Sequence, residues 1–115
     1  MSSLRELVIN GTGVSDLAPL RGLGLESLAA TGNNIRSVEV LRHLPKLRSL
    51  FVGRNPIESL PELGVDSPLT FADVSETRIR DVCPLVRVRA LLDLVTPNRD
   101  IWDTSRLERQ RLRCP

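Results

Sequence analysis

The stretch that decides the fold is Leu47-Arg-Ser-Leu50-Phe-Val52-Gly-Arg-Asn55-Pro-Ile57. Leu50 and Val52 are apolar residues two positions apart, which is the side-chain period of a short β-strand. The glycine, asparagine and proline that follow are turn residues, so the strand must end early. One strand and one turn bury too little apolar surface to be stable alone. The fold therefore depends on further copies of this stretch.

Four more copies are present. The five copies open with leucines separated by 21, 22, 22 and 22 residues: Leu4, Leu25, Leu47, Leu69 and Leu91. Apolar or small residues follow each leucine at its third, fifth, tenth and thirteenth positions, although the last copy has threonine at two of these. Such self-similarity is typical of a solenoid, in which each unit adds one strand to a parallel sheet and one layer to a shared core.

Two of the copies, residues 25–35 and 47–57, match the consensus LxxLxLxxNxI of the leucine-rich-repeat family. The chain resembles that family over nearly its whole length. The period, with the segments 14–20 and 79–85, is most similar to the internalin type, and the intracellular phosphatase-regulator type shares the period. The resemblance implies an α/β repeat fold: a right-handed solenoid with a parallel β-sheet on the concave face and irregular or short helical convex arms.

The ninth position of each copy follows the strand. Asn33 and Asn55 occupy it in the second and third copies. We expect both side chains to turn inward and to satisfy backbone groups where the chain leaves the strand. Thr12 and Thr77 stand at the same position and are expected to do so more weakly.

Regularity is expected to fail in the fifth copy. Its ninth position is Arg99, and an arginine does not enter a packed ladder cheaply. We therefore divide the chain into leucine-rich repeats over residues 1–95 and a degenerate last repeat with a C-terminal cap over residues 96–115. Trp102 is interpreted as a lid over the core, and the apolar spacing of residues 106–113 predicts a helix with a polar face.

Composition is that of an ordinary globular domain, with 41% apolar and 26% charged residues. The net charge of +2 is too small to indicate binding to nucleic acid or to a membrane by itself. The sequence contains no long apolar run and no signal-peptide pattern at its start, so an intracellular, cytoplasmic location is expected. Cys83 and Cys114 lack a CxxC spacing, and we interpret them as two free thiols.

No catalytic constellation is found in the sequence. The single histidine, His43, lies on a connecting arm without a local nucleophile or carboxylate arranged beside it, and we interpret it as a solvated residue. The glycines lie in repeat turns without a phosphate-loop lysine, and the carboxylates form no calcium loop. We therefore predict that the protein is not an enzyme and holds no cofactor and no metal.

Solenoids of this kind bind partners through the concave sheet, and the strand period predicts which side chains face it. The two predicted rows are Val8, Ala29, Phe51, Asp73 and Val95, and Glu6, Ser27, Ser49, Phe71 and Asp93. Phe51 and Phe71, the only phenylalanines of the chain, are one strand and two residues apart in these rows. This places them within reach of a diagonal contact.

The two phenylalanines are the predicted centre of a surface that binds another protein, because an aromatic centre with a charged rim is common in protein interfaces. The predicted partner-binding residues are Phe51, Phe71, Arg54, Asp73, Arg48, Glu76 and Val95. Among these, Arg54 and Asp73 are expected to set the orientation of the partner. The alternative is that the two rings only cover each other and the sheet.

The first repeat offers a different function. No cap precedes it, so its apolar layer is expected to be open: Leu4, Leu7, Ile9, Val14 and Leu17. Three explanations compete, namely a fragment of a longer array, a homodimer paired end to end, and a partner that completes the sheet. In the last two cases the protein is a structural subunit of a larger assembly.

A nucleic-acid contact is the least favoured alternative. It would use the C-terminal arginines, aided by two earlier ones: Arg106, Arg109, Arg111, Arg113, Arg87 and Arg89. Glu108 interrupts the run, and the aromatic residues on which single-stranded bases stack are missing beside it.

Overall fold

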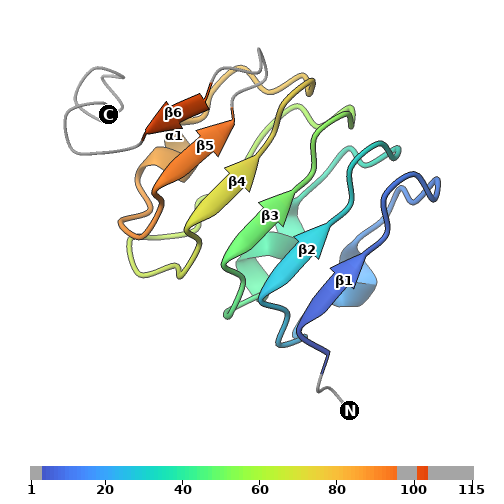
Figure 1. Ribbon diagram of the computed structural model, residues 1–115, viewed down its shortest axis with the longest axis horizontal. Helices are drawn as coiled ribbons and strands as arrows, with labels where there is room; N and C mark the ends of the chain where they lie inside the picture. The colour runs from blue at the N-terminus through green and yellow to red at the C-terminus, as the bar shows by residue number, and fades with distance from the viewer. Residues whose placement is uncertain (1–3, 96–100, 104–115) are drawn as a thin grey trace.

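The computed structural model describes residues 4–95 and 101–103. Six short strands form one open sheet in chain order (Figure 1). They are β1 (Glu6–Val8), β2 (Ser27–Ala29), β3 (Ser49–Phe51), β4 (Phe71–Asp73), β5 (Asp93–Val95) and β6 (Ile101–Asp103). The first five strands pair in parallel, and β6 pairs with β5 in the antiparallel direction.

The strand register follows the spacing of the leucines. Glu6 is paired with Ser27, and Ser27 with Ser49, so the first two steps are 21 and 22 residues. The next two steps, through Phe71 to Asp93, are 22 residues each. The prediction of one parallel strand per copy is therefore confirmed, and both predicted rows are rows of the observed register.

The core lies behind the sheet. The middle residue of each strand from β2 to β5 is fully buried: Leu28, Leu50, Ala72 and Leu94. The leucines that open the second to fifth copies are buried with them, as are Ala30, Val52 and Val74 just after the strands. Adjacent copies thus share one apolar core, because a single copy is too small to bury its own leucines.

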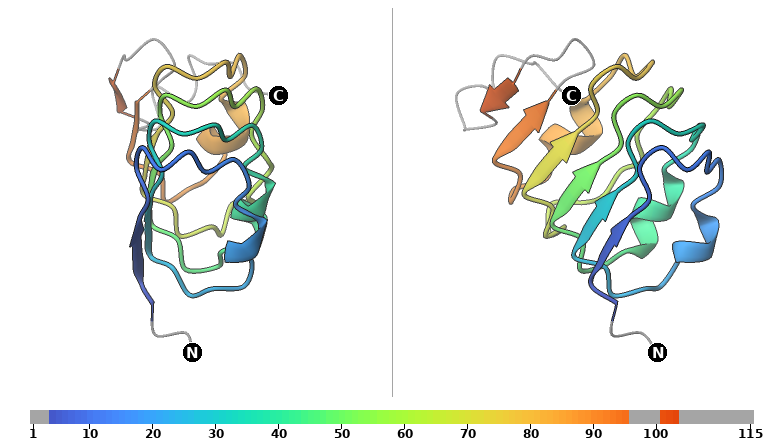
Figure 2. Two further views of the ribbon diagram at one scale, coloured as in Figure 1. Left: turned by 90° about the vertical axis from the view of Figure 1, so that its right-hand side faces the viewer. Right: turned by 45° about the vertical axis from the view of Figure 1, so that its right-hand side comes forward.

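Short helices lie on the side of the core opposite the sheet (Figure 2). They are η1 (Ala18–Leu20), η2 (Glu39–His43) and α1 (Cys83–Val86). Two of them begin in the same way. Asp16 Oδ1 accepts a hydrogen bond from the Ala18 N–H, and Asp81 Oδ1 accepts one from the Cys83 N–H, each at 2.9 Å. A proline follows in the first turn of both helices, where its missing N–H is not needed.

Asn33 and Asn55 are the buried polar residues of the described chain. Asn55 Oδ1 accepts hydrogen bonds from the N–H groups of Asn33 and Ile35, and its Nδ2 donates to the carbonyls of Ala30, Val52 and Gly53. Asn33 bridges the first and second copies in the same way. The predicted inward role of both asparagines is confirmed, because each satisfies backbone groups that the turn leaves without a strand partner.

The two threonines make fewer bonds. Thr12 Oγ1 donates to the carbonyl of Ile9 at 2.8 Å, and Thr77 Oγ1 donates to the carbonyl of Val74 at 2.8 Å. A hydroxyl has one donor where a carboxamide has two, so the weaker role expected of threonine is also confirmed.

The prediction of free thiols is wrong for Cys83, which is disulfide-bonded. The other cysteine of the sequence, Cys114, lies outside the described residues. Cysteine spacing gave no sign of this bond, because disulfide formation depends on how close the folded chain brings two Cα atoms and not on their separation in sequence.

The parallel order ends at β5, as the irregular fifth copy predicts. The register sets Trp102 of β6 opposite Leu94 of β5. The lid role of the Trp102 side chain and the helix expected over residues 106–113 lie outside the described residues, and the division at residue 95 stays a prediction. Within the described part of the chain, no helix has the length and apolar character needed to cross a membrane.

Candidate protein-binding face

The first and third residues of every strand point away from the core, because the second residue is buried and side chains alternate along a strand. Together these residues form what we call the strand face. One of its rows is Val8, Ala29, Phe51, Asp73 and Val95, and the other is Glu6, Ser27, Ser49, Phe71 and Asp93. The strand face is regular, because each residue is held at a fixed register by the pairing behind it.

Phe51 and Phe71 contact each other on the strand face. Their ring centroids are 5.0 Å apart with an interplanar angle of 40°. The predicted diagonal contact is therefore confirmed. Both residues remain half-buried, so the rings cover part of each other and leave part of their surface to solvent.

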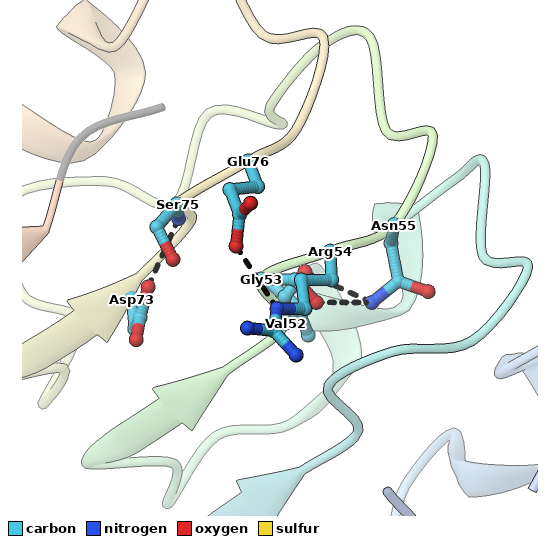
Figure 3. A network of polar contacts seen from close by, with 7 residues as sticks. All are labelled: Val52, Gly53, Arg54, Asn55, Asp73, Ser75 and Glu76. Carbon is cyan, nitrogen blue, oxygen red and sulfur yellow. Dashed lines mark hydrogen bonds and ion pairs between the residues drawn. The ribbon is translucent and has the colours of Figure 1, made fainter. Parts of the chain in front are cut away.

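Arg54 and Glu76 follow β3 and β4 by three residues each, beyond the ends of the two rows. The Nε of Arg54 donates a hydrogen bond to Oε2 of Glu76 at 2.9 Å (Figure 3). Both residues have a left-handed backbone, with φ of 55° and 53°. Gly11 and Gly32 hold the same place in the first two copies with φ of 63° and 70°. A side chain there is strained, because its Cβ approaches the neighbouring carbonyl.

Asp73 is fixed by its own turn. Its Oδ1 accepts a hydrogen bond from the N–H of Ser75 at 2.9 Å (Figure 3). Gly53 lies beside this turn, and a Cβ added to it would stand 2.8 Å from Ser75 Oγ and 2.9 Å from Ser75 O. The turns after β3 and β4 therefore approach each other as closely as they do only because residue 53 has no side chain.

The remaining predicted residues lie at the margin of this cluster. Val95 is half-buried and is the register partner of Asp73. Arg48 is exposed and immediately precedes β3, where its carbonyl accepts hydrogen bonds from the N–H groups of Thr70 and Phe71. Thus four of the predicted residues lie in the two rows, and the three others, Arg48, Arg54 and Glu76, lie at the strand ends.

Sequence reasoning named Asp93 and Val8 in the rows but left them out of the predicted site. Asp93 is exposed and is the register partner of Phe71. Val8 is 69% exposed and shares a row with Phe51, with the small side chain of Ala29 between them. The row assignment was the signal that identifies both residues, since it already sets each one on the strand face.

The other candidate residues lie elsewhere. His43 is exposed and ends η2, where its carbonyl accepts a hydrogen bond from Gly22. Arg87, one of the arginines of the nucleic-acid alternative, is paired with Glu62. The four C-terminal arginines of that alternative fall outside the described residues. Across residues 4–95 and 101–103, no group of three or more histidine, cysteine, aspartate or glutamate side chains is arranged to hold a metal ion.

No protein-family model matches the chain, and no curated protein matches its sequence. Among solved structures, the chain is similar to the crystal structure of an internalin from Listeria monocytogenes, at 21% identity and with a TM-score of 0.49. The similarity covers 80% of this chain and 41% of that one. The chain therefore spans about two-fifths of the length of that internalin.

Proposed function

We propose that this chain is a noncatalytic leucine-rich-repeat module, a right-handed solenoid that binds another protein through its strand face as the concave side. The observation that carries the proposal is the pair of phenylalanine rings, in contact at 5.0 Å and half-buried on an otherwise small and polar face. Aromatic residues are enriched at the centres of protein interfaces, where one well-packed cluster contributes most of the binding energy.

The surroundings of the rings support this proposal. Strand pairing fixes the backbone on both sides of Phe51 and Phe71. Asp73 is held by Ser75, and Arg54 by Glu76. A surface whose side chains are already ordered loses little conformational entropy on binding, so more of the contact energy appears as affinity.

The test is the double variant Phe51→Ala/Phe71→Ala. A random dodecapeptide library displayed on phage is selected against the wild-type protein, and the selected peptides are then measured against both proteins. We expect the double variant to fold and to lose these peptides. The matched control is Val65→Ala, which removes an apolar side chain that is 48% exposed and lies outside the two rows.

Two results contradict the proposal. The first is a set of selected peptides that bind the double variant as tightly as the wild type. The second is a double variant that fails to fold, because the rings would then be needed for stability.

A second function, assembly through β1, has an observation in its favour. Leu7 and Ile9 are only half-buried, whereas Leu28 and Ala30, their counterparts in the next copy, have no exposed surface. Val8 and Leu4 add exposed apolar surface at 69% and 45%. A second copy or a further repeat packed on β1 would cover this layer. Light scattering over a concentration series tests it: a dimer that Leu7→Asp dissociates supports assembly, and a monomer at all concentrations argues against it.

A further inference from the structure

The strand face changes character between β3 and β5. Phe51 on β3 is the register partner of Asp73 on β4, and Phe71 on β4 is the register partner of Asp93 on β5. Each ring thus has a carboxylate directly across one strand spacing, which is about 4.8 Å. The rings and the carboxylates alternate, so a single side chain laid on this patch meets an aromatic surface and an anion together.

Neither carboxylate has a cationic partner among the described residues. The ion pairs there are Arg5 with Glu26, Arg42 with Glu39, Arg54 with Glu76 and Arg87 with Glu62. Asp73 uses one oxygen for the Ser75 N–H, which orients the group without neutralising its charge. The nearest cation of the strand ends, Arg54, is already compensated by Glu76 at 2.9 Å.

The uncompensated charge lies on one side of the rings. Arg48, the other cation of this region, immediately precedes β3, and the register places its strand on the side of β4 away from β5. On the β5 side, the register sets Asp103 of β6 opposite Asp93. Acidic residues therefore stand at register positions in β4, β5 and β6, and no lysine or arginine lies in any of these three strands.

We infer, resting on the proposed function, that the partner protein inserts an arginine side chain on this patch, which we call the Phe–Asp patch: Phe51, Phe71, Asp73 and Asp93. An arginine satisfies both parts of the patch. Its guanidinium is planar and stacks on an aromatic ring, and its N–H groups point outward in the plane to carboxylates at the ring's edge. Its aliphatic stem covers the apolar surface that the two rings leave exposed.

Other occupants fit less well. A lysine ammonium is a compact charge that cannot stack and that contacts one carboxylate at a time. A partner carboxylate or a phosphate would face Asp73 and Asp93 across the rings and be repelled. An uncharged apolar side chain would cover the rings but would leave both carboxylates partly desolvated without a partner.

The experiment uses the peptides selected on the wild-type protein by phage display. Each peptide is synthesised in three forms that differ at every arginine: the original, one with lysine, and one with citrulline, which keeps the shape and loses the charge. Binding is measured by fluorescence anisotropy to the wild type and to Asp93→Asn and Asp73→Asn, with Glu58→Gln as the matched control. Glu58 is exposed and lies outside the two rows. Asparagine at residue 73 keeps an oxygen for the Ser75 N–H, and Asp93 is exposed, so both variants are expected to fold.

The expected result is an arginine in the selected peptides and a loss of affinity of about tenfold or more with citrulline, with Asp93→Asn and with Asp73→Asn. Lysine should restore only part of the loss, and Glu58→Gln should change nothing. Peptides that need Phe51 and Phe71 but bind equally well with citrulline, or equally well to both asparagine variants, overturn the arginine inference and leave the proposed function standing. Peptides that do not depend on the two phenylalanines overturn both.

Discussion

Arg54 and Glu76 are joined by a hydrogen bond of 2.9 Å although both have a left-handed backbone. The first two copies place glycine at the equivalent positions, where this conformation carries no strain. The third and fourth copies accept strain at two adjacent turns and obtain a fixed pair of charges beside Phe51. Strain retained at neighbouring non-glycine residues is a common property of functional surfaces.

Arg54 allows that strain to be measured. Arg54→Gly and Arg54→Ala both remove the exposed ion pair, and they differ only in whether a Cβ remains. We expect the glycine variant to be more stable than the alanine variant by about 1 kcal/mol, because glycine adopts a positive φ without penalty. Urea denaturation gives both free energies of unfolding. Equal stabilities would mean that the backbone at residue 54 is not strained.

Gly53 and Gly24 are a matched pair of glycines. A Cβ at residue 53 would stand 2.8 Å from Ser75 Oγ and 2.9 Å from Ser75 O, whereas one at residue 24 would meet only Lys46 Cδ at 3.8 Å. Gly53→Ala is therefore expected to lower the free energy of unfolding by roughly 1 to 3 kcal/mol, since the backbone of Ser75 must move. Gly24→Ala should lower it little or not at all. Similar effects of the two substitutions would contradict the close approach of the two turns.

Asn55 is expected to be among the most sensitive polar residues. Asn55→Ala leaves two N–H groups and three carbonyls without their side-chain partner. With about 1 to 3 kcal/mol for each buried group left unsatisfied, the loss should be large enough to unfold a domain of ordinary stability. Asn34→Ala, at the adjacent exposed position, is the control and should be nearly neutral. Circular dichroism during thermal unfolding distinguishes the two.

Leu50 and Phe51 are neighbours that should differ in opposite ways. Leu50 is fully buried, so Leu50→Ala should lower the free energy of unfolding by about 2 to 5 kcal/mol. The ring contact of Phe51 with Phe71 should give a coupling energy of about 0.5 to 1.5 kcal/mol in a double-mutant cycle to alanine. Urea denaturation of the single and double variants measures both quantities. A coupling energy of zero would mean that the rings do not pack together in solution.

Much of the fold is predictable from the sequence because its rules are local and repeated. The interval between leucines sets the register of β1 to β5, and the alternation within each strand sets the rows that contain Phe51 and Phe71. The inward role of Asn33 and Asn55 follows from chemistry, since a buried carboxamide must find donors and acceptors.

The rest depends on geometry that no local pattern encodes. The antiparallel β6 follows a segment with no repeat pattern, and the bond at Cys83 depends on the path of the chain between distant residues. The left-handed backbone of Arg54 and Glu76 carries one signal, their alignment with Gly11 and Gly32. That signal is visible only when the copies are stacked by register, since neither residue type favours such a conformation.

The asparagine ladder also determines how the chain comes apart. Asn33 bonds the second copy to the first, and Asn55 bonds the third to the second, whereas Thr77 bonds only within its own copy. The step from the third copy to the fourth therefore lacks this side-chain link and should be the weakest coupling in a nearest-neighbour description of unfolding. The Phe–Asp patch spans this step, with Phe51 on one side and Phe71 on the other. A bound partner would act as a clamp, and slower hydrogen exchange in the fourth and fifth copies would accompany binding.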